Sequence, residues 1–186
     1  MTQGITGVYS AAATPIEADG SPCFELFTAH CHGLLAEGCH GIALLGTTGE
    51  ANNFSVDERM ALLDAACVSG ISGDQLLPGT SCSNLSETKA LTAHALSCQV
   101  KACVILPPFY YKGVSDEGLF RFYAQLVEEL KDSRLKIILY HIPQMTQVPI
   151  NHDLVARLRA DFPDVFVGIK DSAGDIENMK KMVKSF

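Results

Sequence analysis

Short apolar segments recur along this chain about every 32 residues, and longer segments with helical spacing separate them. Most of the short segments are apolar on successive residues, as at 42–45 and 137–140. Uninterrupted apolar runs of this length predict strands that are buried on both faces, as parallel sheets require. The six predicted strands cover residues 7–14, 41–46, 75–81, 102–108, 136–143 and 166–172.

The segments between these runs carry the spacing and the start signals of helices. The clearest apolar stripe consists of Leu119, Phe122, Tyr123, Leu126, Val127 and Leu130. Ser55 and Glu58 form the pattern of a capping box, and Asn151 and Asp175 are suitable helix caps. Strands that alternate with helices predict an α/β fold with a parallel sheet.

Two α/β architectures compete, an open doubly wound sheet and a (β/α)8 TIM barrel. No predicted strand is followed by Gly-x-Gly-x-x-Gly or by a P-loop, so the nucleotide-binding signs of an open sheet are missing. Polar residues instead recur at the carboxyl ends of the strands, for example at 46–50, Tyr140 and Lys170. Barrel enzymes place their active sites on that face, which favours the barrel.

The length of 186 residues suits one domain but not a whole barrel. Eight such units need roughly 250 residues, so we expect residues 1–186 to form a single, incomplete TIM-barrel domain with about the first six β/α units. An unclosed sheet would expose its edge strands. We therefore expect the chain to be a poor catalyst or unstable alone unless a partner closes the barrel.

Composition narrows the class of protein. A hydrophobic share of 47% fits a globular core, and a net charge of −7 argues against nucleic-acid binding. No apolar stretch approaches the ~20 residues of a membrane span, and the amino terminus resembles no secretory signal. The seven cysteines lack Cys-x-x-Cys spacing. We therefore expect a reduced, cytoplasmic protein with neither a disulfide framework nor a zinc site.

Lys170 and Tyr140, at the ends of two predicted strands, each have two interpretations. Lys170 is either a charge that emerges from a buried strand into solvent or an amine that apolar surroundings desolvate. Burial disfavours the ammonium form of a lysine, and a neutral amine can attack a ketone to form a Schiff base. Tyr140 is either a core aromatic residue or a phenol that relays a proton.

Two loops also leave alternatives open. The turn Gly46-Thr47-Thr48-Gly49-Glu50 is either a tight turn with capping hydroxyls or a nest of backbone N–H groups that holds a carboxylate. Tyr110 and Tyr111 could serve packing, subunit contact or catalysis. The histidines are interpreted as structural. His30, His32 and His40 have no carboxylate partner at metal-ligand spacing, His94 and His152 lie in helical contexts, and strand alternation would point His141 away from Tyr140.

The strand ends resemble those of the dihydrodipicolinate synthase / N-acetylneuraminate lyase family of pyruvate-dependent class I aldolases. The segments that carry the resemblance are Ala13-Thr-Pro15, Gly46-Thr-Thr-Gly-Glu50, Pro108-Phe-Tyr-Tyr111, Leu139-Tyr-His-Ile-Pro143 and Gly168-Ile-Lys-Asp-Ser-Ala-Gly-Asp175. They follow one another in the family's order.

This resemblance implies roles for particular residues. Lys170 would form the Schiff base with pyruvate or another 2-oxo acid, and Tyr140 would donate and accept protons on that adduct. Thr47 would pass protons between tyrosines, Thr48 would hold the pyruvate carboxylate, and Tyr111 would be the relay tyrosine that crosses from a neighbouring subunit. Family members need no metal or organic cofactor and are commonly tetramers built from dimers, so we expect this chain to form a homodimer or homotetramer.

The sequence departs from the synthases of that family at the position that binds the aldehyde substrate. They carry an arginine five residues after the tyrosine of the fifth strand, where this chain has Met145. The residues 79–84 also differ from the usual Gly-Thr-Gly-Ala-Asn. We therefore expect an aldolase or lyase acting on another small 2-oxo acid. The alternatives are 4-hydroxy-tetrahydrodipicolinate synthase, also called dihydrodipicolinate synthase, and a catalytically silent barrel fragment.

Overall fold

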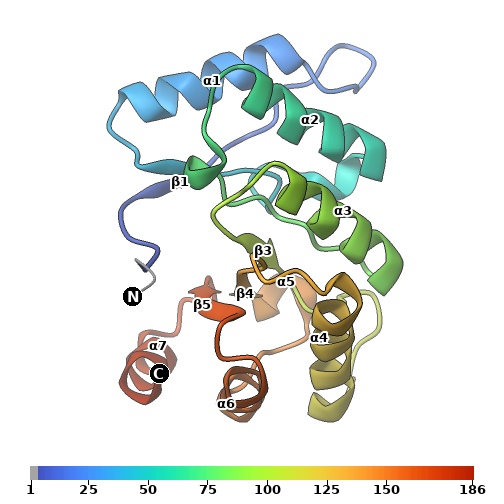
Figure 1. Cartoon of the computed structure of the whole chain (residues 1–186), viewed down its shortest axis with the longest axis vertical. Helices are drawn as coiled ribbons and strands as arrows, with labels where there is room; N and C mark the ends of the chain where they lie inside the picture. Colours follow the sequence, from blue (N-terminus) through green and yellow to red (C-terminus); the bar gives the residue numbers. More distant parts are fainter. Residues whose placement is uncertain (1–3) are drawn as a thin grey trace. The chain divides into compact units, whose positions relative to one another are not determined.

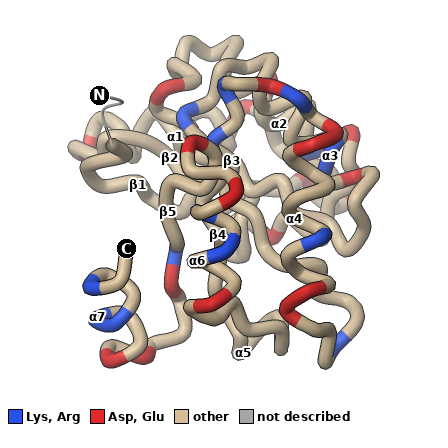
Figure 2. The backbone as a smooth tube through the Cα atoms, turned by 60° about the horizontal axis from the view of Figure 1, so that its bottom comes forward, with Lys and Arg blue, Asp and Glu red and all other residues tan. Residues whose placement is uncertain are grey.

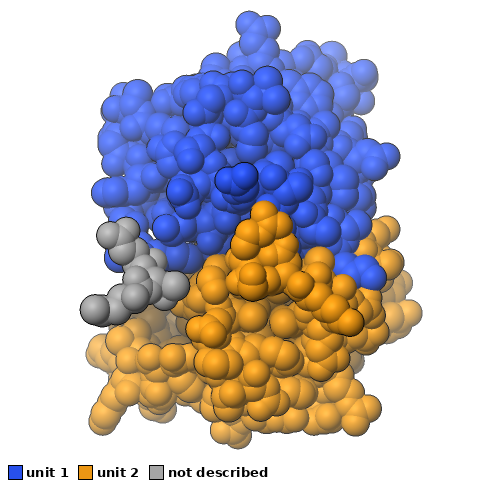
Figure 3. Space-filling model, viewed as in Figure 1, with its two compact units in different colours: residues 1–80, 89–104 blue, residues 81–88, 105–186 orange. Residues whose placement is uncertain are grey.

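The computed structural model describes residues 4–186 and confirms an α/β fold with parallel strand pairs. The chain divides into two compact units, which Figure 3 distinguishes by colour. The first unit comprises Met1–Thr80 and Lys89–Val104, and the second comprises Ser81–Thr88 and Ile105–Phe186.

The first unit is built from two strands and three helices that lie side by side in Figure 1. Strands β1 and β2 pair in parallel, with Tyr9 opposite Gly41. The capping box predicted for Ser55 and Glu58 is confirmed at the start of α2, which buries Leu62 and Leu63. The elements are β1 (Tyr9–Ala11), α1 (Phe24–Ala36), β2 (Gly41–Ala43), η1 (Ala51–Asn53), α2 (Val56–Val68), η2 (Gly73–Gln75) and, from Lys89 onward, α3 (Leu85–Ser97).

The strand predicted at residues 75–81 is wrong as a continuous strand. The segment begins in the short helical turn η2 and then makes only isolated bridges, Leu76 with Ile42 and Gly79 with Val104. Pro78 lies between the two bridges and has no N–H to donate to a ladder. The segment is nevertheless held in place, because Gly79 N donates to Leu44 O at 2.8 Å.

The second unit continues the strand–helix alternation. Its helix caps were predicted correctly: Asn151 accepts from the backbone of α6, and Asp175 accepts from that of α7. In α7 the acidic residues come first and the basic residues last, as Figure 2 shows, which complements the helix dipole. The elements are α4 (Asp116–Leu130), β4 (Ile137–His141), α5 (Pro143–Thr146), α6 (His152–Asp161), β5 (Phe166–Asp171) and α7 (Ile176–Ser185), with β3 (Cys103–Ile105) at the boundary between the units.

Strands β4 and β5 pair in parallel, but their register shifts by one residue near the start. Ile137 lies opposite Phe166, whereas Ile138 lies opposite Gly168, so Val167 is an extra residue in β5. After this shift the pairing is regular and brings Tyr140 opposite Lys170. The strand segments predicted from the sequence are all longer than the strands observed, because their ends continue into turns and loops.

The interior of each unit consists mainly of aliphatic side chains from strands and from the inner faces of helices. Ile42, Leu44 and Leu62 are fully buried in the first unit. Ile137 and Leu126 are fully buried in the second. Between residues 4 and 186, no helix is both long enough and apolar enough to cross a membrane.

Candidate active site

Lys170 and Tyr140 meet at the carboxyl ends of β4 and β5. The Nζ atom of Lys170 lies 3.7 Å from the centroid of the Tyr140 ring. The tyrosine is only 4% exposed, whereas the lysine is half-buried. The face of the ring therefore supports the amine from one side.

The backbone that follows Lys170 is fixed by the carboxylate of Asp171. Its Oδ1 atom accepts a hydrogen bond from Ala173 N at 2.8 Å, and its Oδ2 atom accepts one from Asn178 Nδ2 at 3.2 Å. Ser172 N in turn donates to His141 O at 2.8 Å. These contacts restrict the motion of the strand end that carries the lysine. Asp171 is therefore a positioning residue that the sequence reasoning did not single out as one.

His141 is buried beside this strand end and has a structural role. Its Nδ1 atom accepts a hydrogen bond from Ile150 N at 3.1 Å. Because a backbone N–H can only donate, this contact fixes Nδ1 as an acceptor. The histidine thereby joins β4 to the segment that precedes α6, in keeping with the structural role expected from the sequence.

The turn after β2 contains Thr47 and Thr48, whose side chains are exposed in the first unit. It is flanked by two residues with positive φ, Leu45 at 57° and Glu50 at 50°. A leucine with positive φ is strained, and such strain is common near functional sites. Within the turn Glu50 N donates to Thr47 O at 3.1 Å.

Gly49 allows this turn to pack tightly against the residues that follow β1. A Cβ atom there would lie 3.0 Å from Ala12 O and 3.2 Å from the Thr14 hydroxyl. That hydroxyl donates to Gly49 O at 2.8 Å. Thr14, part of the Ala-Thr-Pro segment noted in the sequence, therefore holds the turn, and Thr48 is exposed to solvent.

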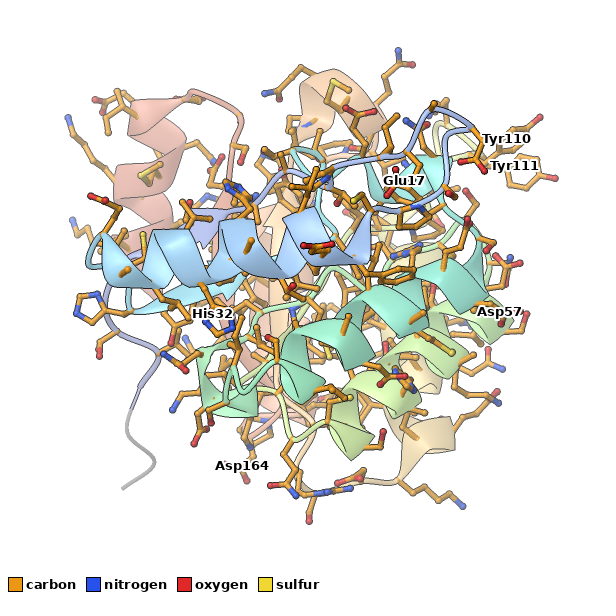
Figure 4. All side chains as sticks on the ribbon, turned by 90° about the horizontal axis from the view of Figure 1, so that it is seen from above. Glu17, His32, Asp57, Tyr110, Tyr111 and Asp164 are labelled. Atoms are coloured by element: carbon orange, nitrogen blue, oxygen red, sulfur yellow. The ribbon has the colours of Figure 1, made fainter. Side chains whose placement is uncertain are left out.

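Tyr110 and Tyr111 lie on the loop between β3 and α4, with 71% and 74% of their surfaces exposed. Their rings contact each other edge to face at 5.1 Å, and Figure 4 shows both side chains extending away from the ribbon. Lys112 anchors this loop, since its Nζ atom donates to Phe109 O and, at 2.9 Å, to Thr146 O. The sequence carried no signal for this anchoring role.

The helix α5 begins directly after the Tyr140 strand and contains Met145. The methionine side chain is exposed, so the departure seen in the sequence lies on an accessible surface of the second unit. The neighbouring Gln144 donates through Nε2 to Ser172 O and so links α5 to the end of β5. This helix therefore supports the lysine strand without presenting a cation of its own.

The five site residues expected from the sequence divide between the units. Thr47 and Thr48 belong to the first, and Tyr111, Tyr140 and Lys170 belong to the second. The structure brings Lys170 and Tyr140 into contact and places Tyr111 against Tyr110. The pairing of a strand-end lysine with a buried tyrosine is the arrangement best suited to chemistry at a small carbonyl compound.

Comparison with known proteins matches all of the described residues to one protein family. The model of the Dihydrodipicolinate synthetase family matches residues 4–186. An uncharacterized DapA-like lyase of Chloroflexus aurantiacus is 35% identical over 97% of this chain and 60% of its own length. The matched region thus includes every residue of the candidate site.

Solved structures agree with this match. Dihydrodipicolinate synthase from Agrobacterium tumefaciens str. C58 superimposes with a TM-score of 0.93 at 31% identity, over 96% of this chain and 62% of the synthase. The chloride-inhibited dihydrodipicolinate synthase from Acinetobacter baumannii, complexed with pyruvate, gives a TM-score of 0.88 at 29% identity, over 97% and 60%. The chain spans about 60% of the length of the curated relatives it matches.

Proposed function

Because this chain belongs to the Dihydrodipicolinate synthetase family, we propose that it is a pyruvate-dependent class I aldolase. It would form or cleave a carbon–carbon bond of a small 2-oxo acid, with pyruvate as the keto component. The observation that carries this proposal is the position of the Lys170 amine, 3.7 Å above the ring of the buried Tyr140.

The reaction begins at the Lys170 amine. In its neutral form the amine attacks the ketone carbon, and the resulting carbinolamine loses water to give an iminium ion. In the cleavage direction the iminium accepts the electron pair of the bond between the α and β carbons, and the β-hydroxyl loses its proton, which releases an aldehyde and leaves an enamine. Protonation of the enamine and hydrolysis release pyruvate and restore the lysine.

Tyr140 is proposed as the proton donor and acceptor in these steps, since it contacts the amine from which the adduct forms. Its phenol would protonate the departing hydroxyl of the carbinolamine and take a proton from the aldol hydroxyl during cleavage. Thr47 and Tyr111 are proposed to pass protons to and from this tyrosine, and Thr48 to hold the carboxylate of pyruvate.

The exposed Met145 bears on the choice of substrate. A methionine cannot make the paired hydrogen bonds by which arginine binds a carboxylate. We therefore favour a 2-keto-3-deoxy sugar acid or a 4-hydroxy-2-oxo acid as the compound that is cleaved. The similarity to a dihydrodipicolinate synthase supports 4-hydroxy-tetrahydrodipicolinate synthase as the alternative, and condensation of pyruvate with aspartate semialdehyde distinguishes the two.

The architecture proposed for this function is one TIM-barrel domain to which the chain contributes the first six β/α units. The strand–helix alternation, the parallel pairs and the family match support it. The proposal also includes a reaction that proceeds without metal or organic cofactor, a homodimer or homotetramer, and a cytoplasmic location. The proposed lysine adduct would supply the electron sink that such a reaction needs.

Reduction of the adduct tests the proposed function. Protein incubated with pyruvate and borohydride should gain one reduced pyruvyl group, and peptide mapping should place it on Lys170. The variant Lys170→Arg should gain none. Lys136→Arg is the matched control, because Lys136 lies just before β4 and its Nζ atom donates to Asp164 O. Absence of an adduct on Lys170, or its survival in Lys170→Arg, would overturn the assignment.

A further inference from the structure

Four side chains with metal-binding atoms lie on or next to α2 and α3 in the first unit. Asp64 and Cys67 lie three residues apart on α2, and Cys98 directly follows the last residue of α3, four residues after His94, with its N–H donating to His94 O at 3.2 Å. Residues with these spacings share one face of a helix. We call these four residues the α2–α3 cluster, and Figure 1 shows its two helices side by side.

The distances within the cluster are short. Asp64 Oδ1 lies 2.9 Å from His94 Nε2 and 3.7 Å from Cys98 Sγ, and that sulfur lies 4.0 Å from His94 Nε2. The ligand atoms of these three residues all lie within 4.8 Å of one another. Cys67 lies beside Cys98 but outside this group of three, and its thiol is the fourth candidate ligand.

These distances suit a tetrahedral zinc ion. Zinc binds sulfur at about 2.3 Å and nitrogen or oxygen at about 2.0–2.2 Å, which puts neighbouring ligand atoms roughly 3.6 Å apart. Two thiolates, one imidazole and one carboxylate form a donor set of the kind that zinc prefers in proteins. The measured separations differ from the tetrahedral value by amounts that rotamer changes on two helices can supply.

The surroundings of the cluster also favour a cation. The Asp64 side chain is 53% exposed and that of His94 is 22% exposed, which gives an ion a path from solvent. A divalent ion bound between these side chains would deprotonate the two thiols as it binds.

We propose that Asp64, Cys67, His94 and Cys98 bind one Zn²⁺ ion and thereby join α2 to α3. The site is structural, because its four protein ligands leave no open position for a substrate. It is independent of the Schiff-base chemistry proposed for Lys170. Absence of Cys-x-x-Cys spacing predicted that the chain has no zinc site, but ligands from two adjacent helices need no such motif.

Zinc titration of the reduced, metal-free protein tests this proposal. In competition with a chromophoric chelator, the chain should bind one equivalent of Zn²⁺. Replacement by Co²⁺ should give the thiolate charge-transfer band and the strong visible bands of a tetrahedral site. Cys98→Ser and His94→Ala should each weaken zinc binding by more than about 100-fold, beyond the loss typical of an outer-shell partner.

Matched variants keep the test decisive. Cys39→Ser and His32→Ala remove the same residue types outside the cluster and should leave zinc binding unchanged. Asp64→Asn replaces a half-exposed side chain by one of equal size, so it should weaken binding without unfolding the helix. The proposal is overturned if no stoichiometric site is found, if the cobalt spectrum lacks thiolate bands, or if the cluster and control variants bind zinc equally.

Discussion

Lys170 gains its position from its neighbours in β4 and in the segment after β5. The ring of Tyr140 lies under the amine, and Asp171 fastens the following backbone to the first turn of α7. A tyrosine contributes two separable properties here, an aromatic face and a phenol hydroxyl. Only the hydroxyl can transfer a proton, so a substitution that removes it and keeps the ring separates proton transfer from support of the amine.

Tyr140→Phe should keep the ring under Lys170 and remove the proton donor. We expect the reduced pyruvyl adduct to form on the same lysine but about 10²- to 10⁴-fold more slowly, the usual worth of general acid–base catalysis. Quenched-flow trapping followed by intact mass analysis measures this rate. Tyr123→Phe is the control, since Tyr123 is a fully buried tyrosine of the same unit whose hydroxyl donates to Ile105 O. Equal rates in the two variants would contradict the role of Tyr140.

At the scale of the elements, residues 76–79, which follow η2 and form the two isolated bridges, depend on the absence of a side chain at Gly79. A Cβ atom there would lie 2.2 Å from Leu45 O, which is backbone and cannot move aside alone. Leu45 is also the strained residue that introduces the Thr47–Thr48 turn. The close approach at Gly79 therefore couples the bridged segment to the conformation of that turn.

Gly79→Ala should destabilise the protein by at least about 1–3 kcal/mol, the usual cost of overpacking a close contact. Gly33→Ala should instead stabilise it by about 0.5–1 kcal/mol, because Gly33 lies inside α1 with open space around its Cα. Urea unfolding of both variants measures the two changes. If both variants changed the free energy of unfolding by a similar amount, the close contact at Gly79 would not be important for stability.

Much of this fold could be predicted from local patterns, since apolar runs mark buried strands and capping residues mark helix starts. Ser55, Asn151 and Asp175 all cap the helices expected of them. The apolar pattern did not show that Pro78 divides a predicted strand. A proline interrupts strand pairing only where its missing N–H would face a neighbouring strand, and the neighbouring strand is known only from the structure.

Part of the candidate site could also be predicted from the sequence. Tyr140 and Lys170 were both expected at strand ends, and the structure adds their contact. The α2–α3 cluster was missed, because its halves are about 30 residues apart in sequence and each half contains only two ligands. Recognising it requires knowing which helices are neighbours, and spacing within one helix does not supply that.

For the molecule as a whole, the exposed pair Tyr110 and Tyr111 indicates a surface that other chains can cover. Large aromatic side chains are enriched at the centres of protein interfaces and are costly to leave in water. The proposed homo-oligomer gives these tyrosines a partner and brings Tyr111 to a neighbouring subunit.

The double variant Tyr110→Ala, Tyr111→Ala should weaken self-association at least about tenfold, given the usual energetic weight of aromatic residues at interfaces. Sedimentation velocity over a range of protein concentrations measures this shift toward monomer. Val68→Ala removes an exposed apolar side chain elsewhere and should leave the distribution unchanged. A wild-type chain that remains monomeric at every concentration would contradict the expected assembly.

The extra residue Val167 in β5 determines which single-residue deletions these two strands can accept. Because β5 contains one residue without a counterpart in β4, a deletion at Val167 leaves Tyr140 aligned with Lys170. β4 has no such spare residue, and a deletion between Ile138 and Tyr140 would turn the tyrosine to the opposite face. We therefore expect the protein to tolerate deletion of Val167 from β5 but not deletion of a residue between Ile138 and Tyr140 in β4.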